Sequence, residues 1–149
     1  MVPLTPIHLL LADDDLDDRL FFKEAIDELP IEASVITVSD GVELMHHLNG
    51  SEEKPHVLFL DLNMPRKNGF DCLEEIKRSE ALNHIPVVIY STSFDAEMVN
   101  VLYEKGAQHY VCKPGDFMKL KQVIHDTLIA VVTSKTLPAS KDNFVIEVK

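Results

Sequence analysis

Several polar residues directly follow short apolar runs, and their types suit phosphoryl chemistry beside a metal ion. Asp13 and Asp14 follow one run, Asp61 a second, Ser91 a third and Lys113 a fourth. Clustered carboxylates repel one another unless a cation neutralises them, and hard oxygen ligands favour Mg²⁺, with Mn²⁺ as the alternative. Asp61 could then accept a phosphoryl group as an acyl phosphate, while Lys113 and Ser91 bind the phosphoryl oxygens.

Each of these residues also has a simpler interpretation. Asp61 alone could be a turn residue and Lys113 a surface lysine. We assign the other acidic residues of this region, Asp15, Asp17 and Asp18, to capping the next helix and complementing its dipole. The metal hypothesis therefore depends on the coincidence of acids, hydroxyl and lysine at the ends of different apolar runs.

The elements that must position these residues are visible as alternating patterns. The runs rich in Val, Ile and Leu predict buried strands at His8–Ala12, Ala33–Val38, Val57–Leu60, Val87–Tyr90 and Tyr110–Cys112. Helical patterns occupy Gly41–Asn49, Asp71–Arg78 and Ala96–Glu104, and apolar stripes mark two further helices, one through Phe22, Ala25, Ile26 and Leu29 and one through Phe117, Leu120, Ile124 and Leu128.

Strict alternation of strand and helix predicts the α/β class, a doubly wound parallel sheet with helices on both faces. In such sheets the site lies outside the carboxyl ends of the strands, where the acids, hydroxyl and lysine are expected. We assign residues 1–134 to one domain and 135–149 to a loose C-terminal tail, whose run FVIEV could form a strand or an edge contact.

Composition narrows the function classes. The chain has 149 residues, 46% of them hydrophobic, which fits one domain with a real core. A formal net charge of −11 argues against direct binding of nucleic acid or an anionic membrane surface. No signal peptide or membrane-inserting segment is evident, so we expect a cytoplasmic protein. Cys72 and Cys112 are interpreted as reduced packing residues.

The motifs LLLADDD, LFLDLNMPRKNGFD, IPVVIYSTS and GAQHYVCKP resemble, in this order, the receiver domains of two-component response regulators. The resemblance covers about residues 7–132, and the separations of Asp61 from Ser91 (91 − 61 = 30) and from Lys113 (113 − 61 = 52) agree with the family. It implies a stand-alone, chemotaxis-regulator-like receiver with a flavodoxin-like sheet of five strands in the order 2-1-3-4-5.

The same resemblance implies roles for individual residues. Asp61 matches the phosphoacceptor and Lys113 the phosphate-binding lysine. Asp13 and Asp14 match the metal-binding acids, and the backbone carbonyl of Asn63 matches a further metal ligand. Such a protein is a signalling switch that takes part in its own phosphoryl transfer and dephosphorylation, and it is no turnover enzyme.

Family members switch through a hydroxyl residue matching Ser91 and an aromatic residue matching Tyr110. Phosphorylation would shift the face formed by helix 96–104, strand 110–112 and the following helix. Implied partners are a sensor histidine kinase or histidine phosphotransfer protein, a downstream effector, and a second copy bound through that face. Thr92, where receivers often have Ala or Gly, is expected to alter the phosphorylated lifetime, and Gly69 matches a turn glycine.

Other functions fit the residues less well. A phosphatase of the haloacid dehalogenase type needs an acid two residues after its nucleophile, where this chain has Asn63. A receiver-like scaffold would have lost acidic or lysine positions that are all present here. A histidine phosphocarrier would rest on His46 and His47, which point apart on a helix. A DNA-binding regulator would need a reading module, for which the residues after Ser134 are too few.

Overall fold

The computed structural model describes residues 6–92, 94–133 and 143–147. Helices and strands alternate along the chain, in the order β1 (Ile7–Ala12), α1 (Leu16–Glu28), β2 (Ala33–Val38), α2 (Gly41–Gly50), β3 (Val57–Leu60), α3 (Gly69–Arg78), β4 (Val87–Ser91), α4 (Ala96–Glu104), β5 (His109–Cys112), α5 (Phe117–Thr133) and β6 (Val145–Ile146). The first ten elements agree with the predicted alternation, with boundaries shifted by a few residues.

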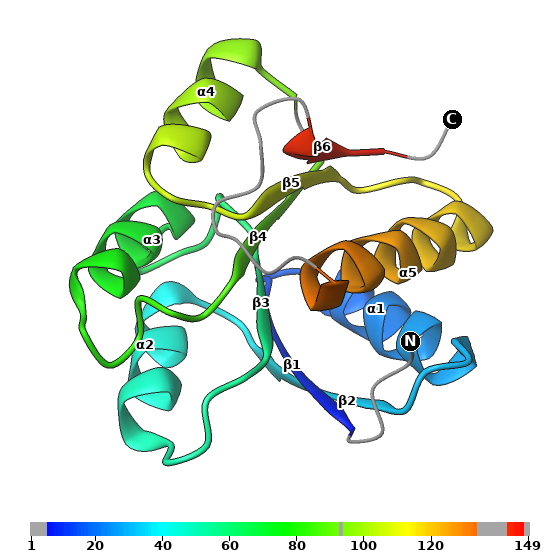
Figure 1. Cartoon of the computed structure of the whole chain (residues 1–149), viewed down its shortest axis with the longest axis horizontal. Coiled ribbons are helices and arrows are strands. Elements are labelled where there is room, and N and C mark those ends of the chain that lie inside the picture. The colour runs from blue at the N-terminus through cyan, green and yellow to red at the C-terminus, as the bar shows by residue number, and fades with distance from the viewer. Residues whose placement is uncertain (1–5, 93, 134–142, 148–149) are drawn as a thin grey trace.

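The strands form one parallel sheet in the order β2-β1-β3-β4-β5-β6. Helices α1 and α5 cover one face of this sheet, and α2, α3 and α4 cover the other (Figure 1). The predicted fold class and the order of the first five strands are confirmed. The prediction of five strands was wrong, because the sheet has six.

The sixth strand comes from the segment predicted to be a loose tail. β6 pairs in parallel with β5, with Tyr110 opposite Val145 and Val111 opposite Ile146. Phe144 is only 1% exposed, and its ring meets that of Tyr103 edge to face at 5.3 Å. Burial of this phenylalanine favours adding Val145–Ile146 to the sheet. Residues 134–142 of the predicted tail lie outside the described residues, and the domain boundary stays a prediction.

Each face of the sheet has its own hydrophobic core. Toward α1 and α5, the rings of Phe22, Phe59 and Tyr90 meet edge to face, with centroids 4.9 to 6.1 Å apart. The opposite core includes side chains from β1, β3 and β4 and from the inner faces of α2 and α3. Strands covered on both faces explain why the apolar runs are continuous rather than alternating.

Side chains in the connections after the strands start the helices. Asp15, Asp40, Asn68 and Asp95 are the N-caps of α1 to α4, and each accepts a hydrogen bond from a backbone N–H of the first turn. Such caps satisfy donors that a helix leaves unpaired, each worth about 1 kcal/mol. They fix where each helix leaves the sheet, and so shape the edge that carries the candidate site.

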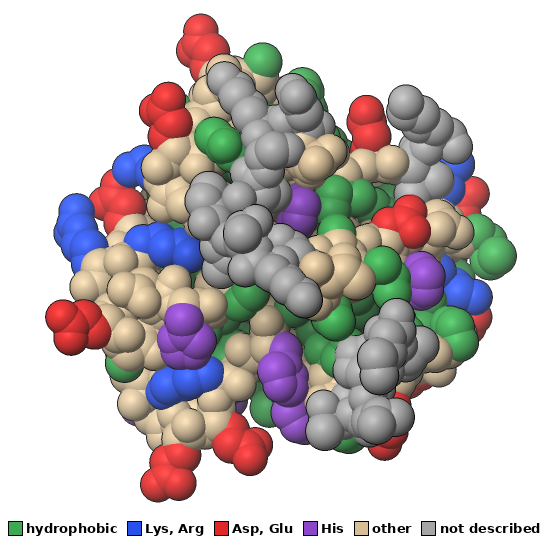
Figure 2. All heavy atoms as spheres, in the orientation of Figure 1, with side chains coloured by type: hydrophobic (Ala, Val, Ile, Leu, Met, Phe, Trp, Pro, Cys, Tyr) green, Lys and Arg blue, Asp and Glu red, His purple; other side chains and the backbone are tan. Residues whose placement is uncertain are grey.

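The surface shows mixed charge. On the face drawn in Figure 2, acidic side chains stand around the margin and basic side chains lie among them, with several histidines nearer the middle. Among the described helices, none combines the length and apolar character that a membrane span requires.

Candidate functional site

Three carboxylates meet at the carboxyl ends of the strands. Asp13 and Asp14 follow β1 and Asp61 follows β3, and one carboxylate oxygen from each residue lies within 4.8 Å of the other two. Asp13 is 0% exposed and Asp61 is 7% exposed, whereas Asp14 is exposed. The arrangement joins two shielded carboxylates with one that faces solvent, as an accessible cation site requires.

The backbone hydrogen bonds between neighbouring strands continue for one residue beyond the strand ends, and they fix the positions of the site residues. The backbone N–H of Asp13 donates to the Val38 carbonyl at 3.1 Å, and that of Asp61 donates to the Ala12 carbonyl at 2.9 Å. In the same way, the Lys113 N–H donates to the Ser91 carbonyl at 2.8 Å. Neighbouring parallel strands therefore deliver their first polar residues to one edge of the sheet.

The amine of Lys113 lies in the middle of the acids. Its Nζ is 2.7 Å from Asp13 Oδ2, 3.0 Å from Asp18 Oδ2 and 3.3 Å from Asp61 Oδ2. It also lies 4.9 Å from the centre of the Tyr90 ring, a cation–π contact. The side chain is only 7% exposed, so these contacts are made largely out of water.

The pKa values of Asp13 and Lys113 reflect their burial and their charged neighbours. Burial raises the pKa of Asp13 to about 6; the Lys113 amine opposes this shift and the Asp61 carboxylate adds to it. For Lys113, burial alone would lower the pKa, but the ion pairs with Asp13, Asp18 and Asp61 outweigh it and raise the pKa. Three carboxylate oxygens so close together are a donor set that suits a divalent cation.

The loop after Asp61 is held by close backbone contacts. A Cβ on Gly69 would lie 2.3 Å from the Asp61 carbonyl oxygen, and a Cβ on Gly41 would lie 2.0 Å from the Lys67 carbonyl oxygen. The φ of Gly69 is not left-handed and the residue begins α3, so it is required for lack of space rather than for a turn. The Asn63 N–H donates to Asp61 Oδ1 at 3.3 Å, which places Asn63 beside the acids.

The predicted switch residues lie deeper. Ser91 ends β4 and is 0% exposed, while Thr92 next to it is exposed. Tyr110 on β5 is 1% exposed, and its ring lies 6.1 Å from that of Phe94, edge to face. Strand β6 pairs with β5 beside Tyr110, and the tyrosine side chain lies in the hydrophobic core.

Two residues of α1 belong to the site but were not predicted there. Asp18, whose predicted role was helix capping, pairs with Lys113, and the capping carboxylate is that of Asp15, which accepts the Asp18 N–H at 3.1 Å. Arg19 donates from Nη1 to the Asp13 carbonyl at 2.6 Å. The motif DDDLDDR contains both residues, but only the orientation of α1 shows which of its acids turn toward the lysine.

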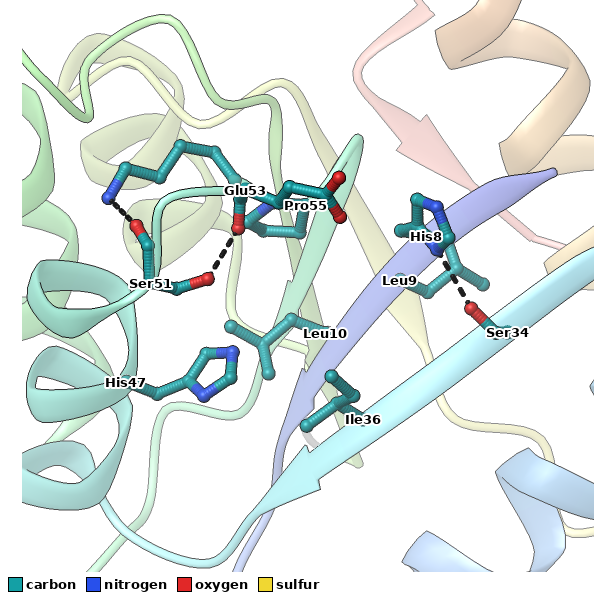
Figure 3. A pocket seen from close by; sticks show the side chains of 10 residues that line it. His8, Leu9, Leu10, Ser34, Ile36, His47, Ser51, Glu53 and Pro55 are labelled. Carbon is teal, nitrogen blue, oxygen red and sulfur yellow. Dashed lines mark hydrogen bonds between the residues drawn. The ribbon is translucent and has the colours of Figure 1, made fainter. Parts of the chain in front are cut away.

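A separate hollow of about 120 Å³ lies between β1, β2 and the end of α2. His8 and Ser34 on the two strands are hydrogen-bonded at 2.9 Å, and His47 points toward Leu10 and Ile36 (Figure 3). No residue of the acidic cluster lines it, so phosphoryl chemistry is not assigned to this hollow.

Comparison with known proteins agrees with this geometry. Residues 9–125 match the response regulator receiver domain family. The response regulator Rcp1 of Synechocystis sp. is 30% identical over 140 residues, which cover 91% of this chain and 95% of Rcp1. The two-component response regulator ARR6 of Arabidopsis thaliana is 29% identical, with 85% of this chain and 71% of ARR6 covered.

Solved structures give the same result. The phosphorylated cyanobacterial phytochrome response regulator RcpA superimposes with a TM-score of 0.80 at 29% identity, covering 91% of this chain and 100% of RcpA. The Mn²⁺-bound form of Rcp1 gives 0.77 at 29% identity, with 90% and 100% covered. The chain therefore belongs to the response regulator receiver domains, the phosphorylation-dependent signalling switches of two-component systems.

Proposed function

We propose that Asp61 accepts a phosphoryl group from a phosphohistidine, in a step that requires Mg²⁺ or Mn²⁺ held by Asp13, Asp14, Asp61 and the Asn63 carbonyl. The observation that carries this proposal is the convergence of three carboxylates within 4.8 Å, with the Lys113 amine 3.3 Å from Asp61. The relative Rcp1 has been crystallised in a Mn²⁺-bound form, which supports the choice of ion.

The chemistry follows from the positions of the side chains. An Asp61 oxygen attacks phosphorus, an O–P bond forms, and the P–N bond breaks with its electron pair leaving on the donor imidazole. When bound, the metal ion supplies positive charge to the phosphoryl oxygens and to the carboxylates around them. The Lys113 ammonium neutralises a phosphoryl oxygen on its own side of the cleft, and the Ser91 hydroxyl provides a further donor.

The same residues account for hydrolysis of the acyl phosphate. Water attacks phosphorus, the O–P bond to Asp61 breaks, and the carboxylate is restored. Thr92 is exposed beside buried Ser91, and its β-branched side chain would narrow the approach of that water. The chain thus takes part in its own phosphorylation and dephosphorylation, as a switch rather than as an enzyme that turns over external substrates.

Output is proposed to pass through Ser91 and Tyr110 to the face formed by α4, β5 and α5. The two residues lie near each other in the sheet, since β4 and β5 pair with Ile89 opposite Tyr110 and Ser91 opposite Cys112. A phosphoryl group that draws the Ser91 hydroxyl toward it would change the packing around Tyr110. The proposed partners are a histidine kinase or phosphotransfer protein, a protein effector and a second copy of the chain, all in the cytoplasm.

Acetyl phosphate with Mg²⁺ tests the assignment. Intact-mass measurement should show one added phosphoryl group on the parent chain and none on Asp61→Asn. Asp71→Asn is the matched control, because Asp71 is an exposed aspartate on α3 and the change in charge is the same. Equal labelling of Asp61→Asn and Asp71→Asn would refute the choice of phosphoacceptor.

A further inference from the structure

Lys113 pairs with one carboxylate that does not belong to the proposed metal and phosphoryl site. Among the described residues, the carboxylates within 4.0 Å of its amine belong to Asp13, Asp18 and Asp61. A lysine ammonium has three N–H donors, so these contacts account for all of them. Asp13 and Asp61 lie in the group that could hold a metal ion, together with Asp14, whereas Asp18 does not.

Two of the three contacts must weaken when the site is used. A bound cation competes with Lys113 for Asp13, and phosphorylation removes the free charge of the Asp61 carboxylate. The contact between Lys113 and Asp18 involves neither a residue of the metal group nor the phosphoacceptor. It comes from the first turn of α1, and the Asp18 side chain is 34% exposed.

We propose that Asp18 is the positioning residue of Lys113: it keeps the amine beside Asp61 when Asp13 and Asp61 turn to the metal ion and the phosphoryl group. This inference rests on the proposed function. A charge-assisted hydrogen bond at 3.0 Å with a lysine that is 7% exposed is stronger than a solvent-exposed ion pair. The Tyr90 ring, 4.9 Å away, supports the amine from another side but carries no charge to direct it.

Asp17 provides a matched control. It lies next to Asp18 in the first turn of α1 and is exposed, so its removal changes the net charge and the helix-dipole contribution in the same way. It is not among the carboxylates that pair with Lys113. A difference between Asp18→Ala and Asp17→Ala therefore isolates the contact with the lysine.

The first measurement is the rate of labelling by acetyl phosphate at saturating Mg²⁺. Asp18→Ala should label about tenfold more slowly than Asp17→Ala, because a displaced amine neutralises the transferring oxygens less well. Asp18→Glu and Asp18→Asn should recover part of the rate, since each keeps an oxygen able to accept from Lys113. Equal rates for Asp18→Ala and Asp17→Ala would overturn the proposal.

A second measurement does not depend on phosphoryl transfer. Trace acetylation with acetic anhydride at saturating Mg²⁺, quantified by peptide mass spectrometry, should modify Lys113 several-fold more in Asp18→Ala than in Asp17→Ala, with exposed Lys23 as internal reference. Unchanged reactivity of Lys113 would contradict the proposed hold. A parent chain that takes up no phosphoryl group would instead refute the proposed function, so the two failures are distinguishable.

Discussion

Replacement of Gly69 by alanine should disturb the fold and the phosphoacceptor together. Gly69 begins α3, and an added Cβ would lie 2.3 Å from the Asp61 carbonyl oxygen and 2.9 Å from the Leu62 Cα. Both neighbours are backbone atoms, so no side chain can rotate out of the way. The Asp61 peptide or the start of α3 must therefore move.

The size of the effect follows from the missing space. A separation of 2.3 Å is about 1 Å short of ordinary van der Waals contact, which begins near 3.4 Å. Forced shifts of this kind in a packed region cost about 3 kcal/mol. Because catalytic geometry tolerates little displacement, a shift of about 1 Å at Asp61 should also slow labelling by acetyl phosphate, by up to about 100-fold.

Urea unfolding and labelling kinetics of Gly69→Ala and Gly50→Ala test this reasoning. Gly50 ends α2, and no packing neighbour lies within 4 Å of where its Cβ would stand, so alanine there should be neutral or stabilise by up to about 1 kcal/mol. Both variants make the same chemical change in a helix. Equal stability and equal labelling of the two would refute the argument from close contact.

Three further outcomes are expected. Asp14→Ala should weaken Mg²⁺ binding by about tenfold or more in calorimetric titrations, without unfolding the metal-free protein, because Asp14 is exposed but lies in the carboxylate group. Phe144→Ala should lower the free energy of unfolding by about 3 kcal/mol in urea titrations, since its ring is fully buried against the sheet. Burial lowers the pKa of His109 below 6.5, so the unfolded chain binds more protons there. The free energy of unfolding should therefore fall as the pH falls below about 6.5, and His109→Asn should flatten that dependence in urea titrations at several pH values.

The sequence supports the prediction of the fold because its strands are buried on both faces. Runs such as Val57–Leu60 are continuous in apolar residues, and all four side chains are buried in the structure. A parallel sheet then brings its carboxyl ends together, so residues directly after the strands could be grouped without coordinates. This is why Asp13, Asp61 and Lys113 were expected at one place and lie there.

Features that depend on long-range geometry were not predictable in this way. β6 has two residues, and whether such a short run joins a sheet depends on an open edge and on a place for Phe144. Asp18 and Lys113 are separated by 95 residues in the sequence. The residues around Asp18 therefore indicated only a role in capping its own helix. The contact between Arg66 and Asp40, at 3.3 Å, likewise joins residues from different loops.

The most direct test is to locate the phosphoryl group chemically. Borohydride reduces an aspartyl phosphate to homoserine, which peptide mass spectrometry places at a single residue. After treatment with acetyl phosphate and Mg²⁺, homoserine should appear at position 61, and omission of the metal ion with a chelator present should abolish it. Homoserine at Asp13 or Asp14, or labelling that persists without divalent cations, would contradict the account.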